Sequence, residues 1–109
     1  MKSELPACEE WAISHFFDGD RVLFLSFRQG CVEQFDLDLD SGDRAIETDD
    51  VQGLRRVAHS LKGVLRTIGY EDLSEIAKGV ENAAHLKQWE TAVSQWHEFS
   101  KRLRQTFNL

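Results

Sequence analysis

Apolar residues recur at intervals of three and four positions along most of this chain, and this spacing constrains the fold more than any other feature. The pattern is clearest in residues 89–107, where one helical face carries Trp89, Ala92, Val93, Trp96, Phe99, Leu103 and Phe107. An amphipathic helix turns such a stripe toward a core. The chain of 109 residues has a single proline, so few positions force a helix to end. The spacing therefore predicts long helices joined by short loops.

The same period predicts two helices in the first half of the chain. A short helix opens at Pro6 and ends near Phe16, with Trp11 at core spacing. A long helix runs from Arg21 to about Ile46 and is expected to fray near Ser41 and Gly42. Its apolar stripe comprises Phe24, Phe27, Cys31, Phe35, Leu39 and Ile46. Three apolar residues fall off this stripe and are expected to be exposed, namely Val22, Leu23 and Leu37.

Two more helices are predicted between these segments and the last one. One spans residues 51–68 and the other residues 71–84, with a short connection over residues 85–88. Asp18, Gly19 and Asp20 form a turn and a cap for the long helix. Thr48 is expected to cap the helix that follows it. Gly69 is expected to end that helix, because glycine readily adopts the left-handed conformation at this position.

These elements predict an all-α fold, an antiparallel four-helix bundle with a short additional N-terminal helix. The length suits a single domain over residues 1–109, and Met1 with the compact length favours an independent protein. A chain of this size can bury one core without disulfides or metals. Cys8 and Cys31 form no Cys-x-x-Cys pair, so two reduced, partly buried thiols are expected.

Charge and hydropathy exclude several classes of partner. The formal net charge is −6, which disfavours broad nucleic-acid binding because that binding usually needs a basic face. The longest strongly apolar run, residues 22–25, is far below the roughly 20 residues that span a bilayer. The first residues lack a basic lead into a long apolar run, which disfavours a signal peptide. We therefore expect a soluble, cytoplasmic monomer with neither nucleic-acid nor membrane partners.

His59 is placed unlike its apolar neighbours. At about 100° per residue, the apolar positions of residues 51–68 share one face and His59 falls nearly opposite. The residues that flank it on this polar face are Arg55, Lys62, Gly63 and Arg66. An imidazole that faces solvent, surrounded by cations and next to a glycine, indicates phosphate chemistry on a helix surface.

Each of these residues has a chemical use in that setting. A neutral imidazole is a competent nucleophile near neutral pH and can carry a phosphoryl group covalently. Lys62, one turn away, can neutralise phosphoryl oxygens, and Arg55 and Arg66 extend the positive field. A glycine inside a helix costs about 1 kcal/mol relative to alanine. Room for a phosphoryl group or a docking loop at Gly63 would offset that cost.

The segment Ala58-His59-Ser60-Leu61-Lys62-Gly63 through Gly69, followed by Leu73 and Val80-Glu81, resembles the histidine-containing phosphotransfer (HPt) domains of phosphorelays. The resemblance implies that His59 accepts a phosphoryl group from a receiver-domain aspartate and passes it to another receiver. It implies that Lys62 stabilises the phosphate and that Gly63 lets the receiver approach. The chain departs from the family pattern at Val64 and Leu65, where small residues are common.

The resemblance also implies which groups come from partners. The chain has no glycine-rich nucleotide loop, so it is expected to be a phosphoryl carrier, not a kinase. The partners implied are the receiver domains of a hybrid sensor histidine kinase and of a response regulator. They are expected to dock around His59, using exposed apolar residues such as Leu23 near a basic rim. The chain is expected to need no cofactor of its own, since the receiver would bring Mg²⁺.

Two other functions stay open from the sequence. One is a helical adaptor that binds receivers or other signalling partners without accepting phosphate. The other is a calcium-responsive module, because Asp36, Asp38, Asp40 and Glu47 match ligand positions of a calcium loop, although Ser41 stands where glycine is needed. The remaining histidines, His15, His85 and His97, lack metal-ligand spacing. The tryptophans are interpreted as core residues.

Overall fold

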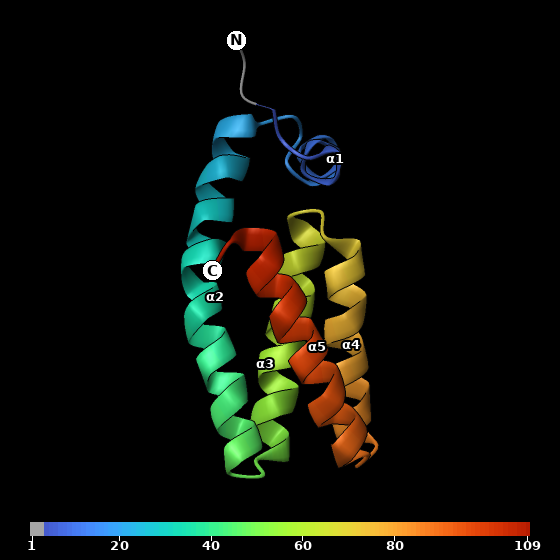
Figure 1. Ribbon diagram of the computed structural model, residues 1–109. Coiled ribbons are helices and arrows are strands. Elements are labelled where there is room, and N and C mark those ends of the chain that lie inside the picture. Colours follow the sequence, from blue (N-terminus) through green and yellow to red (C-terminus); the bar gives the residue numbers. More distant parts are fainter. Residues whose placement is uncertain (1–3) are drawn as a thin grey trace.

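In the computed structural model, which describes residues 4–109, the chain folds into five helices. They are α1 (Ala7–Phe16), α2 (Arg21–Glu47), α3 (Val51–Thr67), α4 (Glu71–His85) and α5 (Trp89–Phe107). Helices α2 to α5 run alternately down and up as an antiparallel bundle (Figure 1). The N-terminal end of α2 extends beyond the other helices, and α1 lies beside it (Figure 1). The predicted all-α bundle with a short additional helix is therefore confirmed. The expectation of an independent protein rested on Met1, which lies outside the described residues.

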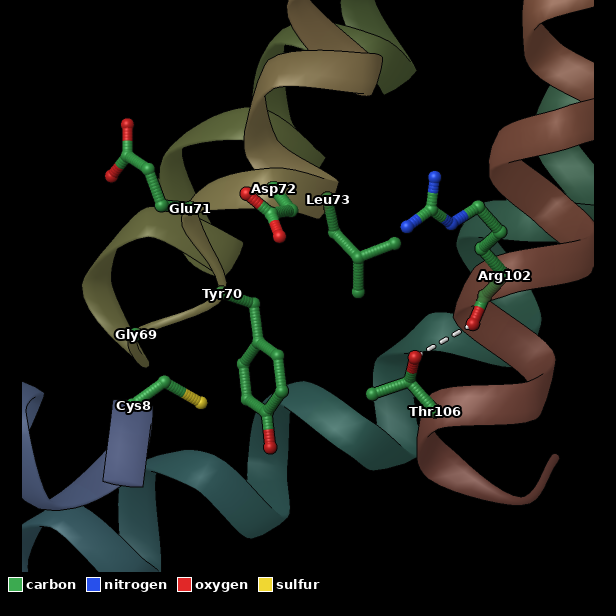
Figure 2. Close-up of a pocket in the computed structure, with 8 residues that line it drawn as sticks. All are labelled: Cys8, Gly69, Tyr70, Glu71, Asp72, Leu73, Arg102 and Thr106. Carbon is green, nitrogen blue, oxygen red and sulfur yellow. Dashed lines mark hydrogen bonds between the residues drawn. The ribbon is translucent and has the colours of Figure 1, made fainter. Parts of the chain in front are cut away.

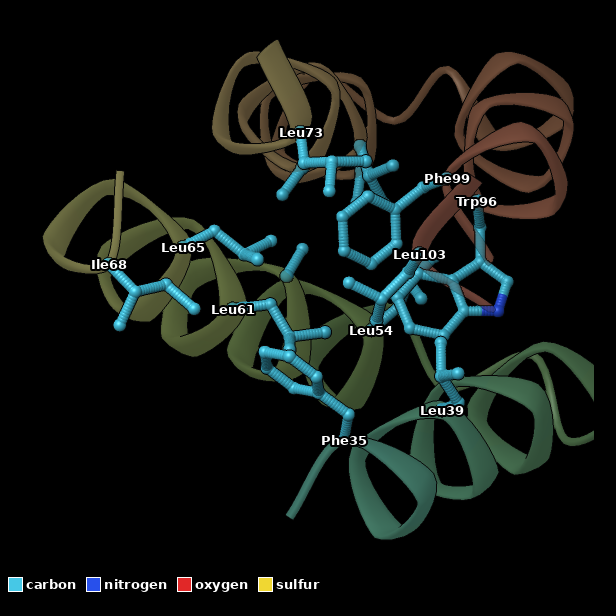
Figure 3. Packing of buried hydrophobic residues seen from close by; sticks show 14 of the residues in the cluster. Phe35, Leu39, Leu54, Leu61, Leu65, Ile68, Leu73, Trp96, Phe99 and Leu103 are labelled. Atoms are coloured by element: carbon cyan, nitrogen blue, oxygen red, sulfur yellow. The ribbon is translucent and has the colours of Figure 1, made fainter. Parts of the chain in front are cut away.

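The core forms where the apolar stripes of the four long helices meet. Trp96, Phe99 and Leu103 of α5 are fully buried and point toward α2 and α3 (Figure 3). Of the apolar stripe predicted for α3, Val57 is half-buried and the others are buried, namely Leu54, Ala58, Leu61, Leu65 and Ile68. The three residues predicted to be exposed on α2 are exposed, Val22 by 81%, Leu23 by 55% and Leu37 by 60%. Because α3 turns its apolar face inward, its opposite face is left to solvent.

The long helix α2 does not fray near Gly42, so that prediction is wrong. Gly42 is buried inside the helix, and a Cβ atom at this position would overlap the ring of Trp96. The Trp96 indole Nε1 donates a hydrogen bond of 2.9 Å to Oδ1 of Asp43. The missing side chain lets α5 pack closely against α2. Gly42 is therefore a packing residue in a continuous helix and not a helix end.

The helix ends follow the predicted chemistry with one correction. Asp20 caps α2 by accepting from the backbone N–H of Leu23. The cap of α3 is Asp50, which accepts from the N–H of Gly53 at 2.9 Å. Thr48 was predicted to be this cap, but its hydroxyl donates to the Arg44 carbonyl at the end of α2. Gly69 ends α3 with φ of +103°, as predicted, because glycine has no Cβ atom to strain there.

Helix α1 is attached to the end of the bundle through Glu9. This carboxylate is fully buried, and Arg28 Nε donates to both of its oxygens at 3.0 and 2.9 Å. The hydroxyl of Tyr70, in the turn between α3 and α4, donates to the same group. Figure 2 shows Tyr70 beside Cys8, and both line a pocket at this end of the bundle. Glu9 therefore links α1, α2 and the α3–α4 turn.

The outer face of α1 corrects a prediction about the tryptophans. Trp96 is buried, but Trp11 is 49% exposed and is not a core residue. Its ring stacks on His15, with centroids 4.1 Å apart. Periodicity placed Trp11 on a stripe, but α1 buries Glu9, Ala12 and Ile13 instead. Phe27 is also more open than predicted, with 39% of its surface exposed.

The described helices include none that combines the length and the apolar character needed to cross a membrane.

Candidate functional site

His59 lies on the outer face of α3, at the middle of the helix. Its side chain is 67% exposed, whereas Ala58 and Leu61, one and two positions away in the sequence, are buried. The helical period produces this contrast, since His59 is about 100° from Ala58 and nearly opposite the core stripe. The imidazole is therefore accessible to a partner while its helix is held firmly by packing.

Glu81 of the neighbouring helix α4 holds both His59 and Lys62. Its Oε2 lies 2.8 Å from His59 Nδ1, and its Oε1 accepts from Lys62 Nζ at 2.8 Å. Partial burial by itself would raise the pKa of Glu81. The hydrogen bonds from Lys62 and His59 outweigh that effect, so the pKa of this carboxyl lies below its usual value. Glu81 is therefore ionised at neutral pH and can only accept hydrogen bonds.

The ionised carboxylate determines the tautomer of the imidazole. Since Glu81 can only accept, Nδ1 of His59 must carry the proton. The lone pair of the neutral ring is then on Nε2, the nitrogen that is free of this contact. A histidine oriented in this way presents one defined nucleophilic atom. Lys62, 30% exposed, keeps two further N–H donors for an anion near the ring.

The other predicted site residues surround His59 in different ways. At Gly63 a Cβ atom would meet nothing within 4 Å, so the surface beside the imidazole is open. Arg66 is exposed one turn beyond Lys62. Arg55 is half-buried, contacts Gln52 at 3.4 Å, and lines a hollow of about 420 Å³ together with His59 and Glu81. The five predicted residues thus share one face of α3.

Glu81 was assigned no role from the sequence. It is 22 residues from His59, so no helical spacing connects the two. It was quoted only within the Val80-Glu81 part of the family resemblance, directly after Val80, a buried member of the α4 stripe. That position places Glu81 at the edge of the face that α4 turns toward the bundle. The tertiary packing of α3 against α4 makes it part of the site.

On the side of His59 away from Glu81, α2 and α3 enclose a groove of about 400 Å³. Val64 forms part of its wall, while Leu65 is fully buried in the core. The two departures from the family pattern therefore have different effects. Leu65 strengthens the core, and Val64 shapes the surface between α2 and α3.

The structure argues against the calcium hypothesis. The segment that would form the calcium loop is a continuous part of α2, whereas a calcium-binding loop must bend around its ion. Within residues 4–109 no three His, Cys, Asp or Glu side chains are grouped as metal ligands. Cys8 and Cys31 are free and partly buried, as predicted.

The fold and the exposed histidine together define a class of protein, a helical bundle that presents an imidazole on its second long helix. A protein-family model described as "Hpt domain" matches residues 23–106. The chain therefore belongs to the Hpt domain family. Membership implies a histidine phosphotransfer role in two-component phosphorelays and an interaction with receiver domains. Searches of curated proteins and of solved structures each found no significant match.

Proposed function

We propose that this protein is a phosphorelay intermediate whose phosphoryl-accepting atom is Nε2 of His59. The observation that carries the proposal is the contact between Glu81 and His59 Nδ1, 2.8 Å long, on an exposed ring beside the open surface at Gly63. This contact leaves Nε2 as the nucleophile. The upstream donor is the receiver domain of a hybrid sensor histidine kinase, and the acceptor is the receiver of a response regulator.

The transfer needs no chemical group other than those of the two proteins and the receiver's metal ion. The Nε2 lone pair attacks the phosphorus of the receiver's aspartyl phosphate. The N–P bond forms, the P–O bond to the aspartate breaks, and the carboxylate leaves. The proton on Nδ1 stays in its hydrogen bond to Glu81, and the ring becomes cationic next to a carboxylate. Attack by a second receiver's aspartate reverses these steps.

The cations of this face stabilise the phosphoryl group during transfer. Lys62 bonds to Glu81 through one N–H, so its other donors can reach the phosphoryl oxygens. Arg66 and Arg55 add positive potential on either side along α3. The receiver supplies Mg²⁺ and the rest of the catalytic groups, and the open surface at Gly63 gives it clearance.

Transfer of label from a phosphorylated receiver tests this function. A radiolabelled receiver is mixed with the protein, and the label on the protein is tested for stability in acid and base. We expect label that is labile in acid and stable in base, which is the behaviour of phosphohistidine. The His59→Gln variant should acquire none while keeping its circular dichroism spectrum, because its side chain lies outside the core.

Two results would contradict the proposal. Label that persists in His59→Gln would exclude His59 as the acceptor. Stable binding of receivers without transfer from any of several tested would favour the alternative function, a helical adaptor.

A further inference from the structure

The groove between α2 and α3 is mostly apolar and lies beside the imidazole. Its lining includes Phe27, Gly30 and Cys31 of α2 and Val64 of α3. On the surface of α3, Gly63 is about 40° and Val64 about 140° from His59, in the same direction. Gly63, where no side chain blocks the surface, therefore lies between the imidazole and the groove. A protein that covers His59 and Gly63 extends over the groove as well.

Asp38 is the one ionisable carboxyl in the lining of this groove. It is half-buried, and burial raises the pKa of its carboxyl, although a hydrogen bond from Gln34 opposes the rise. The donor of that bond, Gln34 Nε2 at 3.3 Å, is an amide without charge. In the part of the chain that the structure describes, no Lys or Arg forms an ion pair with Asp38. Removing a carboxylate partly from water without pairing it with a cation costs free energy. A cation supplied by a partner would lower that cost.

The register of the two helices places this carboxyl level with the imidazole. Cys31 and Val64 line the groove together, and further along Arg44 and Arg56 line another hollow together. Asp38 lies midway between Cys31 and Arg44 on α2. The imidazole lies about midway between Val64 and Arg56 on the antiparallel α3. One docked protein can therefore contact both groups.

We propose that the groove receives a Lys or Arg side chain of the docked receiver domain, with the cation against Asp38 and the aliphatic stem along the adjacent apolar lining toward Cys31 and Val64. This inference rests on the proposed relay function and names the chemistry that the receiver must present. Long basic side chains suit such a site because their stems cover apolar surface while their heads stay charged. Opposite charges at this point fix the orientation in which a receiver approaches His59.

The variant Asp38→Asn tests the pair, with Asp36→Asn as its matched control. Both remove one carboxylate from α2, but Asp36 is exposed and lies outside the groove. The probe is a receiver domain that phosphorylates the wild-type protein in the assay above. Single-turnover transfer is measured against receiver concentration for all three proteins.

For Asp38→Asn we expect the half-saturating receiver concentration to rise about tenfold, because a partly desolvated charge pair loses one partner. The maximal transfer rate should stay unchanged, since Nε2 and its contacts are untouched. Asp36→Asn should behave as wild type. Raising salt from about 50 to 300 mM should weaken binding less in Asp38→Asn than in wild type.

Protection of Cys31 locates the receiver independently. Both thiols are partly buried, but only Cys31 lines the groove. A saturating concentration of the receiver should slow the alkylation of Cys31 and leave the alkylation of Cys8 unchanged. Mass spectrometry measures the alkylation of each thiol. Two results would overturn the proposal. One is the same half-saturating receiver concentration for Asp38→Asn and Asp36→Asn, and the other is a rate of Cys31 alkylation that the receiver does not change. Either result leaves the relay function intact as long as the wild type is labelled at His59, so the two failures are distinguishable.

Discussion

Glu81 links His59 and Lys62. The sequence predicts that these two residues act together on phosphate, but it does not predict how they are held. One carboxylate accepts from His59 and from Lys62, each at 2.8 Å. It therefore sets the orientation of the ring and holds the nearest cation beside it. Positioning of this kind keeps the nucleophile and its electrostatic support in place before a receiver arrives.

The contribution of Glu81 to stability is expected to depend on pH. Its pKa in the folded protein lies below the ordinary value of 4.5, so its stabilising effect is present above that value and is lost as pH falls through the folded pKa. Urea unfolding should show wild type more stable than Glu81→Gln by about 0.5–1 kcal/mol at pH 7, since both partners are partly exposed. The difference should shrink as pH falls below 4.5. A difference that is constant from pH 7 to pH 3 would contradict the assignment.

Gly63 permits a test that separates folding from docking. A Cβ atom there meets nothing within 4 Å, so Gly63→Ala should stabilise the protein by up to about 1 kcal/mol through helix propensity. Gly63→Gln should also fold at least as stably as wild type, yet accept phosphate from a receiver at least about tenfold more slowly, because its longer side chain occupies the approach beside His59. Thermal unfolding and single-turnover transfer measure the two effects. Unimpaired transfer to Gly63→Gln would show that clearance there is not needed.

At the scale of elements, α2 illustrates how packing decides where a helix continues. Its glycines at 30 and 42 have the same intrinsic effect on helix stability. Gly30 faces open space, whereas Gly42 lies under the ring of Trp96. Sequence alone treats both as weak points. The contact with α5 makes one of them necessary.

Alanine substitutions at these two positions should therefore change stability in opposite directions. Gly42→Ala should lower the free energy of unfolding by about 1–2 kcal/mol, because overpacking against Trp96 outweighs the gain in helix propensity. Gly30→Ala on the same helix should raise it by up to about 1 kcal/mol. Chemical denaturation of the two variants measures the effects. Two values of the same sign would contradict the packing role of Gly42.

At the scale of the whole molecule, α1 is held by a buried carboxylate and two buried apolar residues, Ala12 and Ile13, and not by a long apolar stripe. Glu9 accepts from Arg28 and from Tyr70, and thereby joins three segments far apart in the sequence. Burial and the neighbouring carboxylate both raise the pKa of Tyr70, so its hydroxyl stays a donor. Most of the buried core belongs to α2 to α5, whereas α1 adds only Ala12 and Ile13 to it, so the Glu9 cluster is a large part of what positions α1.

Removal of the carboxylate should loosen α1 selectively. Glu9→Ala leaves Arg28 and Tyr70 without their acceptor and should cost about 1–3 kcal/mol. The adjacent Glu10 pairs with Arg21 at an exposed site, so Glu10→Ala should cost less than about 1 kcal/mol. Hydrogen exchange should reveal lost amide protection in α1 of Glu9→Ala, with α3 to α5 still protected. Equal protection of α1 in both variants would refute this anchoring role.

The parts predicted correctly from sequence depend on neighbours along one helix. The stripe of α5, the exposed position of His59 and the stop at Gly69 all follow from helical geometry within a few residues. The error at Thr48 is local, but those at Gly42 and Trp11 occur where a distant segment intervenes. Fraying was predicted near Gly42 because the contact with Trp96, 54 positions away, is not visible in the local sequence, and Trp11 was assigned to the core because helical spacing does not show which face of α1 packs against distant segments.

By itself the sequence determined four amphipathic helices and a short N-terminal one, their order and a solvent-facing histidine among cations, since periodicity and charge are local properties that survive any arrangement of the helices. Only the tertiary structure decided what surrounds that histidine. Packing of α3 against α4 brought Glu81 to Nδ1 of His59, and packing of α3 against α2 left a groove with Asp38 on the other side. The physical reason is that both contacts join residues on different helices, so the register and rotation of packed helices set them.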